Sequence, residues 1–501
     1  MNYTSTRDKK VVVSASRAIS RGISAEGGLF VPTSLPQLSP ERLNRLAGLS
    51  YTGRAADILG DFLDGFSAKE IQNCVETAYT AKKFGEESIT QLAKLGESTY
   101  MLELWHGPTC AFKDMALQLL PYLVTLSGRK NGEEREISIL VATSGDTGKA
   151  ALEGFKDVPG TSCTVFYPQD GVSDVQKRQM TTTGGDNTHV IAVDGNFDDA
   201  QTGVKALFAS KEFAGEMDAR GRVLSSANSI NFGRLVPQIV YYFSAYADLV
   251  ASGAIVEGDY VNFVVPTGNF GNILACYYAR CMGLPVGKMI CASNRNNVLT
   301  DFFRTGCYST ERPFFKTTSP SMDILVSSNL ERLLYEMCDR DSEQIVRWMN
   351  ELKYNGVYHI DERQREWLTS LFDCGYADDE RTAAQIRHVF ETTGYLMDTH
   401  TAVAGAVLDE YRERTGDPRP AVIVSTASPY KFAADVLSAV KGKAAAEGLD
   451  AFACSDELER VSGMPVPTQV RALRELPIRH KGTCGNTPEE MAQAVHAAFG
   501  D

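Results

Sequence analysis

The stretch His106-Gly107-Pro108-Thr109-Cys110-Ala111-Phe112-Lys113-Asp114 decides how the rest of this chain is interpreted. It follows a strand-like run, residues 99–105, and precedes a helix-like run, residues 115–126. Glycine tolerates unusual φ and proline fixes its own, so Gly107-Pro108 predicts a tight turn. Lys113 then stands at a helix start, where the positive end of the dipole favours the neutral, nucleophilic amine of Schiff-base chemistry. The alternative is an ordinary first-turn lysine paired with Asp114.

Composition indicates a large, soluble, globular protein. A chain of 501 residues is long enough for two or three domains, and 43% hydrophobic with 23% charged residues excludes a disordered or fibrous class. The formal net charge of -13 argues against nucleic acid and anionic membranes as partners. The 11 cysteines form no CxxC pairs, which is typical of reduced thiols. With no apolar leader and no membrane-length apolar run, we expect a cytoplasmic protein.

The predicted secondary structure changes along the chain. Residues 1–98 predict a mainly helical N-terminal domain without a catalytic cluster. From residue 99, strands alternate with helices, which is typical of βαβ units and parallel sheets, so we assign an α/β fold class. We expect a large α/β domain from residues 99–135 and 245–501, with a helical insertion at about 323–390, and a small α/β domain from residues 136–244.

Three loops join an apolar strand to a helix: residues 143–148, 266–272 and 425–429. Ligands in open α/β sheets bind beyond the carboxyl ends of strands, where such loops offer backbone N–H groups to an anion. Residues 268–272 are the best phosphate cup, although an ordinary turn explains one such loop alone equally well. The chain lacks the P-loop and dinucleotide motifs. A smaller phosphorylated cofactor with a special lysine indicates pyridoxal phosphate.

Together these residues resemble the threonine synthases. The resemblance runs in the family's order from the first residues to beyond 430, and it is carried by residues 3–7, 27–30, 106–114, 143–148, 226–231, 266–272, 398–401 and 426–432. It is closest to the longer microbial and fungal branch, which carries an extra N-terminal domain. The resemblance implies two open parallel-sheet domains of the tryptophan synthase β-like, pyridoxal-phosphate-binding fold.

The resemblance also implies roles for individual residues. Lys113 would hold pyridoxal phosphate and later move protons, and Thr426 would hydrogen-bond the pyridine nitrogen. The cofactor's phosphate would be bound by Gly268, Asn269, Phe270, Gly271 and Asn272, and the substrate's carboxylate by Ser144, Gly145, Asp146 and Thr147. Related enzymes often carry Asn in place of Asp146, whose carboxylate would repel a substrate carboxylate. We therefore also interpret Asp146 as shaping its loop through backbone bonds. Many relatives have His in place of Ser428, so that position is given no role.

The activity that the resemblance implies converts O-phospho-L-homoserine and water to L-threonine and phosphate. Cations for the substrate's phosphate would come from Lys149, Arg234 or Lys431, each of which is equally well explained as a solvated charge. Asn228, Ser229 and Asn231 are candidates for polar lining or helix caps. We interpret His106 and His400 as structural histidines rather than proton carriers. No metal site is expected.

Two other functions stay open. A phospholyase of the same fold would eliminate phosphate but release a keto acid, and product analysis separates it from a threonine synthase. A non-catalytic protein that binds pyridoxal phosphate is the alternative from another class, and the intact Lys113 with its ligand loops disfavours it. The sequence does not decide between a monomer and a homodimer.

Overall fold

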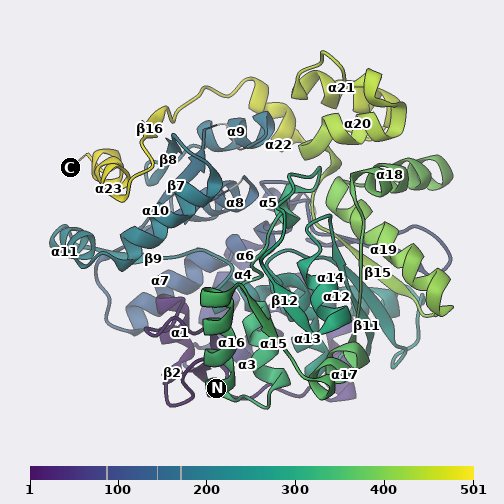
Figure 1. Cartoon of the computed structure of the whole chain (residues 1–501), viewed down its shortest axis with the longest axis horizontal. Helices are drawn as coiled ribbons and strands as arrows, with labels where there is room; N and C mark the ends of the chain where they lie inside the picture. Colours follow the sequence, from purple (N-terminus) through teal and green to yellow (C-terminus); the bar gives the residue numbers. More distant parts are fainter. Residues whose placement is uncertain (86–87, 144, 170–171, 501) are drawn as a thin grey trace.

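The chain forms two mainly parallel sheets that are joined by long helices (Figure 1). The three predicted loops, residues 143–148, 266–272 and 425–429, follow strands of these sheets. The computed structural model describes residues 1–85, 88–143, 145–169 and 172–500. One sheet belongs to a large domain and the other to a small domain, and the N-terminal helices pack against the large domain. This architecture confirms the predicted fold class.

The large sheet has the strand order β14-β11-β10-β15-β5-β4. In that order its strands are Phe372–Tyr376, Val286–Ser293, Val261–Pro266, Ala421–Ser425, Thr99–Glu103 and Gln91–Lys94. All neighbours are parallel except the edge strand β4, which is antiparallel to β5. Strands β10 and β15 are buried along their whole length, because helices cover both faces of the sheet. The loops after β5, β10 and β15 therefore emerge at one edge.

Helices of the large domain position those loops. Helices α6 and α7 follow β5, α12 and α13 flank β10, and α19 packs against the opposite side of β10 and β15. The helices of this domain span Asp114–Leu117 (α6), Leu120–Lys130 (α7), Phe232–Ala251 (α12), Gly271–Cys281 (α13), Val298–Thr305 (α14), Thr399–Thr415 (α19), Ala433–Lys441 (α20) and Ala451–Ser462 (α21).

The small sheet is parallel throughout, in the order β16-β8-β7-β6-β9. Its strands span Gly482–Cys484, Thr188–Val193, Thr161–Pro168, Glu136–Ala142 and Arg222–Ser225, and its helices span Asp146–Phe155 (α8), Asp174–Thr181 (α9), Phe197–Ala209 (α10), Lys211–Ala219 (α11) and Pro488–Ala498 (α23). Figure 1 shows the C-terminal segment crossing from α21 past α22 (Thr468–Arg471) to this sheet. The expected division placed residues 245–501 in the large domain, whereas β16 pairs with β8 and α23 packs on α10.

The N-terminal region combines short helices with a three-stranded sheet, β2-β1-β3. Its elements are Asn2–Ser5 (β1), Val12–Ser14 (β2), Ala15–Arg21 (α1), Phe30–Pro32 (β3), Pro40–Ala47 (α2), Tyr51–Phe62 (α3), Ala68–Ala78 (α4) and Ala81–Phe84 (α5). Serine or threonine side chains cap all five helices, and Ser67 with Glu70 forms a capping box on α4. Helices α2 and α3 pack on α12, which ties this region to the large domain.

The expected helical insertion at about 323–390 contains more than helices. Its helices are Leu330–Met337 (α15), Ser342–Asn355 (α16), Glu362–Leu371 (α17) and Asp379–Thr393 (α18). Strand β13 (Val357–His359) pairs with β12 (Cys307–Ser309), and β14 forms an edge of the large sheet. The sequence of β14 includes Asp373 and Gly375, which break the alternation that predicts a strand.

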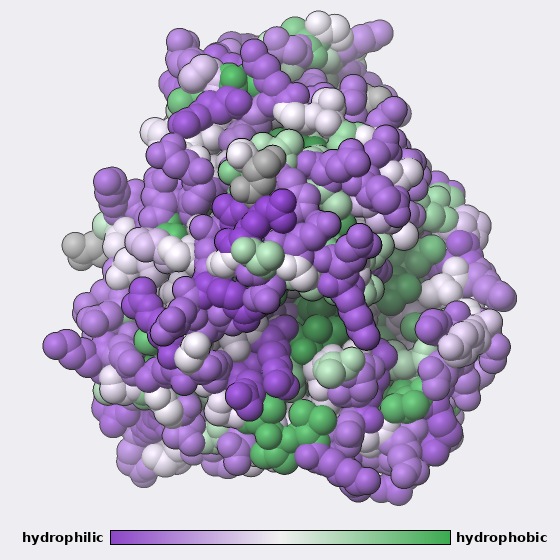
Figure 2. Space-filling view, turned by 90° about the vertical axis from the view of Figure 1, so that its left-hand side faces the viewer, coloured by the Kyte–Doolittle hydropathy of each residue, from purple (hydrophilic) through white to green (hydrophobic). Residues whose placement is uncertain are grey.

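The surface of the molecule is mainly hydrophilic on the small-domain side, with apolar residues gathered in a recess of that face (Figure 2). Among the described helices, none is both long and apolar enough to cross a membrane.

Candidate functional site

Lys113 lies where two of the predicted loops meet. The backbone N–H of Phe112 donates to the carbonyl of Thr426 at 2.8 Å, and the N–H of Ser428 donates to the carbonyl of Cys110 at 3.1 Å. The turn before Lys113 is closed by Asp114, whose carboxylate accepts from the backbone and hydroxyl of Thr109, each at 2.8 Å. Lys113 is therefore the N-cap residue of α6, at a helix start as the sequence predicts.

The amine of Lys113 is held between two domains. Its Nζ lies 3.5 Å from Oδ2 of Asp146, at the start of α8, and donates to Oγ of Ser321 at 3.3 Å. Burial lowers the pKa of Lys113; the carboxylate of Asp146 opposes this effect, and the positive charges of Lys431 and Arg234 add to it. A lowered pKa favours the neutral amine, as a nucleophile and proton carrier requires.

Asp146 is the counter-ion of this cluster. Its Oδ1 lies 2.6 Å from Nζ of Lys431, a fully buried ammonium, and its side chain also accepts from Gln176 at 3.0 Å and Ser321 at 3.2 Å. Burial alone would raise the pKa of Asp146, yet Lys431 and Lys113 outweigh it and hold that pKa well below its usual range. Asp146 thus acts through side-chain ion pairs, and not through the backbone bonds that we had expected.

The α8 loop, residues 143–148, is tightened by a residue that sequence reasoning gave no role. Oγ1 of Thr143 accepts from the N–H groups of Gly145 and Gly148, both at 2.9 Å. Gly145 has a φ of 140°, and a Cβ there would collide with the carboxamide of Gln176. Thr147 is half-buried and its hydroxyl forms no hydrogen bond with the described residues. Ser144 lies outside the described residues.

The α13 loop, residues 266–272, leads into α13, whose first turn has no hydrogen bond from a capping side chain. Phe270 adopts a left-handed φ of 62°. Asn272 is turned away from the helix start, because its Oδ1 accepts from Tyr241 at 2.5 Å and from Tyr242 at 2.7 Å. Its buried Nδ2 has no hydrogen-bond partner among the described residues. The backbone N–H groups of this turn are therefore available to an anion.

The two glycines of the α13 loop differ in their surroundings. A Cβ at Gly268 would lie 2.8 Å from the carbonyl oxygen of Ser321, whereas a Cβ at Gly271 would meet nothing nearer than 3.5 Å. Asn269 is exposed, and its carbonyl accepts from the backbone of Asn329 at 3.1 Å and from its side chain at 3.0 Å.

In the segment before α12, residues 228–231, Asn231 has a structural role, whereas Asn228 and Ser229 remain partly exposed. Asn231 is fully buried; it caps α12 by accepting from Gly233 and donates to the carbonyl of Ile19 at 3.0 Å, so its side chain is occupied. Asn228 and Ser229 are half-buried, and the hydroxyl of Ser229 lies 3.5 Å from that of Ser328.

The three candidate cations have different partners. Lys149 donates to Glu153 and Thr183, which satisfies it within the small domain, and Lys431 pairs with Asp146. The guanidinium of Arg234 donates to the carbonyl of Ala227 at 3.0 Å, while its buried Nε has no partner in the described residues. Burial lowers the pKa of Arg234 to about 10, with no carboxylate opposing it.

Both histidines of interest have carboxylate partners. Nε2 of His106 lies 2.8 Å from Glu103, and the ring stacks on Trp105. Nδ1 of His400 lies 2.9 Å from Asp398, and its Nε2 accepts from the backbone N–H of Ser321 at 3.1 Å. The structural interpretation of His400 therefore agrees with its contacts, although it connects to Lys113 through Ser321. Ser321 itself was missed, because its loop has no strand, helix or glycine signature.

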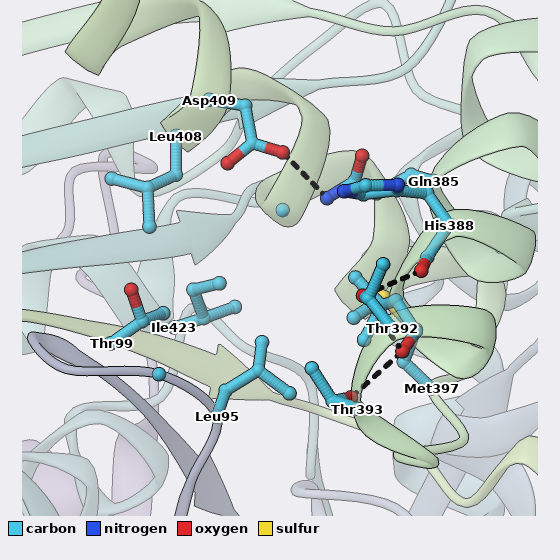
Figure 3. Close-up of a pocket in the computed structure, with 13 residues that line it drawn as sticks. Leu95, Thr99, Gln385, His388, Thr392, Thr393, Met397, Leu408, Asp409 and Ile423 are labelled. Carbon is cyan, nitrogen blue, oxygen red and sulfur yellow. Dashed lines mark hydrogen bonds between the residues drawn. The ribbon is translucent and has the colours of Figure 1, made fainter.

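A separate cavity of about 150 Å³ lies beside Ile423 of β15, and its lining includes no residue of the three predicted loops (Figure 3). It is bounded by the β4–β5 turn, α18 and α19, with Leu95, Leu408 and Ile423 on one side and a hydrogen bond between Gln385 and Asp409 on another. No group of His, Cys, Asp or Glu in the described part of the chain could hold a metal ion.

Comparison with known proteins agrees with these features. Residues 2–79 match the family described as "Threonine synthase N terminus", and residues 87–428 match the family described as "Pyridoxal-phosphate dependent enzyme". A curated threonine synthase of Pseudomonas aeruginosa is 39% identical, covering 89% of this chain and 92% of the relative. The human protein "Threonine synthase-like 1" is 41% identical over 85% of this chain, which spans 58% of that relative's length.

Solved structures give the same result. The structure of PLP-bound threonine synthase from Brucella melitensis superposes with a TM-score of 0.88 at 36% identity, covering 99% of both chains. Yeast threonine synthase has a TM-score of 0.88 at 32% identity, covering 100% of this chain and 99% of the other. The chain therefore belongs to the threonine synthase family of pyridoxal-phosphate-dependent enzymes.

Proposed function

We propose that this chain is a threonine synthase, a lyase that converts O-phospho-L-homoserine and water to L-threonine and phosphate with pyridoxal phosphate bound at Lys113. The main support for this proposal is the excess of positively charged side chains at the site. Lys431 and Arg234 are buried, Lys113 is half-buried near them, and Lys113 and Lys431 share the carboxylate of Asp146. Buried charges require partners, so this cluster favours anionic ligands.

The residues fit the cofactor. The uncapped start of α13 supplies N–H groups for its phosphate, and Gly268 lets the backbone approach closely; the side chain of Asn272 faces Tyr241 and Tyr242, so its backbone N–H is the donor assigned to the phosphate. Thr426 lies beside the Lys113 segment, where its hydroxyl would hydrogen-bond the pyridine nitrogen. When bound, pyridoxal phosphate supplies an electron sink for carbanions formed next to the substrate's amino group.

The substrate's phosphate is assigned to Arg234, with Lys431 as the second candidate. Arg234 is the better candidate because, among the described residues, its guanidinium hydrogen-bonds a backbone carbonyl and keeps a buried, unpartnered Nε, whereas Lys431 is already paired. Asn228 and Ser229 add polar lining on the same segment. Asn231 and Lys149 are not part of this proposal, since their side chains are satisfied elsewhere.

The substrate's carboxylate is assigned to the start of α8, at Ser144, Gly145 and Thr147. Asp146 belongs to the same turn, but its carboxylate is directed to Lys431 and Lys113, which neutralise it. The hydroxyl of Thr147 remains available as a donor. The lowered pKa of Lys113, caused by burial, favours the neutral amine that a proton acceptor requires.

One experiment tests the proposal and its alternative. Purified protein loaded with pyridoxal phosphate is incubated with O-phospho-L-homoserine, and phosphate, threonine and keto acid are measured in the same sample. We expect phosphate and threonine in equal amounts. Phosphate with an equal amount of keto acid would identify a phospholyase, and no phosphate release would leave a binding protein.

We also propose that the partner is this small molecule alone and that the protein is cytoplasmic. All 11 cysteines are unpaired in the structure, which agrees with a reducing compartment. The oligomeric state, monomer or homodimer, is left to a measurement of mass in solution.

A further inference from the structure

A short segment of the large domain, residues 317–323, crosses the site, and we refer to it as the strap. It contains a turn of 3-10 helix, Pro320–Met322, with Ser321 at its centre. The hydroxyl of Ser321 accepts from Nζ of Lys113 at 3.3 Å and donates to Oδ2 of Asp146 at 3.2 Å. One hydroxyl can make both bonds, since it has one proton and two lone pairs. Ser321 therefore links the lysine of the large domain to the carboxylate of the small domain.

The backbone of Ser321 is fixed by a buried histidine. Its N–H donates to Nε2 of His400 at 3.1 Å, so that nitrogen must carry a lone pair. The other nitrogen, Nδ1, lies 2.9 Å from Oδ1 of Asp398 and donates to it. Asp398 is itself held as the N-cap of α19, where it accepts from the N–H groups of His400 and Thr401. The carboxylate thereby sets the tautomer of His400 that Ser321 needs.

The strap is held on two sides, by Asp323 at its end and by contact with Gly268 of the α13 loop. Asp323 accepts from the backbone N–H of Thr317 at 3.0 Å, from its hydroxyl at 2.8 Å, and from Nδ2 of Asn294 at 2.7 Å. On the other side, the carbonyl of Ser321 packs against Gly268, and Ser327 donates to the carbonyl of Gly268 at 2.6 Å. These hydrogen bonds fix the strap in one position, where it forms one side of the site.

We propose that Ser321 is a positioning residue for Lys113, and that Asp398 and His400 act on the lysine through it. The inference rests on the proposed function, because it takes Lys113 as the point at which the cofactor attaches. Without the hydroxyl, Nζ of Lys113 keeps the 3.5 Å contact with Asp146 and its position over the ring of Phe112 but loses its hydrogen bond to the strap, so the flexible lysine side chain samples more orientations. The lysine would then meet the cofactor less often in the geometry that attachment requires.

The first arm of the test uses Ser321→Ala. We expect pyridoxal phosphate to attach roughly tenfold more slowly, measured by the growth of the absorbance band of the lysine-bound cofactor, with a weaker dissociation constant and an unchanged melting temperature of the cofactor-free protein. Ser321→Thr keeps the hydroxyl and should restore most of the rate. Ser455→Ala is the matched control, because its buried hydroxyl donates to the carbonyl of Ala451 within α21 and contacts no residue assigned to the site.

The second arm tests the route through His400. His400→Leu removes the acceptor for the N–H of Ser321, and His400→Gln offers a carbonyl in its place, which also guards against a leucine variant that fails to fold. We expect slower attachment in His400→Leu, partial recovery in His400→Gln, and no further loss when His400→Leu is combined with Ser321→Ala. Losses that add in the double variant would show that His400 acts independently of Ser321.

The outcomes separate the inference from the function beneath it. If the unmodified protein takes up no pyridoxal phosphate, both are wrong. If it takes up the cofactor and Ser321→Ala does so at the same rate, Ser321 does not position Lys113, while the proposed function stands.

Discussion

The α8 loop and the α13 loop have the same architecture and opposite electrostatics. Each connects a buried parallel strand to the first turn of a helix, at the edge where ligands bind. The α8 loop contains its own anion, Asp146, and two lysines gather on that carboxylate. The α13 loop contains no acidic residue, and no side chain caps its helix.

This difference indicates which of the two helix starts needs an anion from a bound ligand. A helix start that has no anion of its own retains free N–H groups and the positive end of the dipole, which favours a phosphate at α13. At α8, the carboxylate neutralises lysines that burial would otherwise leave unpaired. Two loops that look alike in sequence therefore differ: the α13 loop leaves its N–H groups open to an anion, and the α8 loop, besides the carboxylate proposed at its start, holds two lysines with its own carboxylate.

The largest effect is expected from removing the lysine that lies between these loops. Lys113→Ala should abolish turnover and the absorbance of the bound cofactor, because the other amine on the same carboxylate, Lys431, is fully buried and already paired with Asp146. Spectra and product assays of the variant measure this directly. Lys130→Ala, at the end of α7 and paired with Glu70, is the control and should behave as the unmodified protein. Full activity without Lys113 would refute its assignment.

The next largest effect is expected from removing the carboxylate of Asp146 in the α8 loop. Asp146→Asn leaves the fully buried Lys431 without its counter-ion, which costs about 3–5 kcal/mol when one partner of a buried pair is removed. We expect a lower melting temperature and a loss of roughly a hundredfold or more in kcat/KM.

The matched control replaces both partners. Asp146→Asn combined with Lys431→Met removes the stranded charge, so it should recover much of the melting temperature without recovering activity. If the single variant is as stable as the unmodified protein, Asp146 is not the counter-ion that the α8 loop depends on.

A pair of glycine substitutions tests the open α13 loop. Gly268→Ala places a methyl group 2.8 Å from the carbonyl of Ser321 and must shift the strap, whereas Gly271→Ala meets nothing nearer than 3.5 Å. We expect cofactor affinity to fall by roughly a factor of ten to a hundred in the first variant and by less than a factor of three in the second, on the scale of about 1–3 kcal/mol for overpacking. Titration with pyridoxal phosphate measures both. Equal affinities would mean that close approach at Gly268 is unimportant.

Much of this comparison could be predicted from the sequence, because its signals are local. The run before Thr143 and the run before Thr267 are apolar and of strand length, and each is followed by small residues and a helix. Gly107-Pro108 likewise predicted the turn that places Lys113 at a helix start. Patterns of two to ten residues carry that information.

The directions of polar side chains could not be predicted, since partners distant in the sequence decide them. Asn272 belongs to the predicted phosphate cup but faces two tyrosines of α12. Asn231 was a candidate helix cap and caps α12, but its bond to the carbonyl of Ile19 had no signal in the sequence. Ser321 and His400 meet although 79 positions separate them. The strap has no periodicity, so only the folded chain reveals that it completes the site.

The smallest effect concerns which ligand the α8 loop receives. Thr147 carries a hydroxyl that no described residue engages, at a helix start whose own carboxylate is turned toward two lysines. Thr147→Val keeps the side-chain shape and removes one donor, so cofactor attachment at Lys113 should not change. If that donor meets the substrate's carboxylate, kcat/KM for O-phospho-L-homoserine should fall by about tenfold, as for a lost hydrogen bond to a charged group. Binding of 3-aminopropyl phosphate, which lacks the carboxylate, should hardly change, because the phosphate contacts remain. An equal loss for both ligands would place the phosphate at α8, and the assignment of ligands to the two loops would have to be reversed.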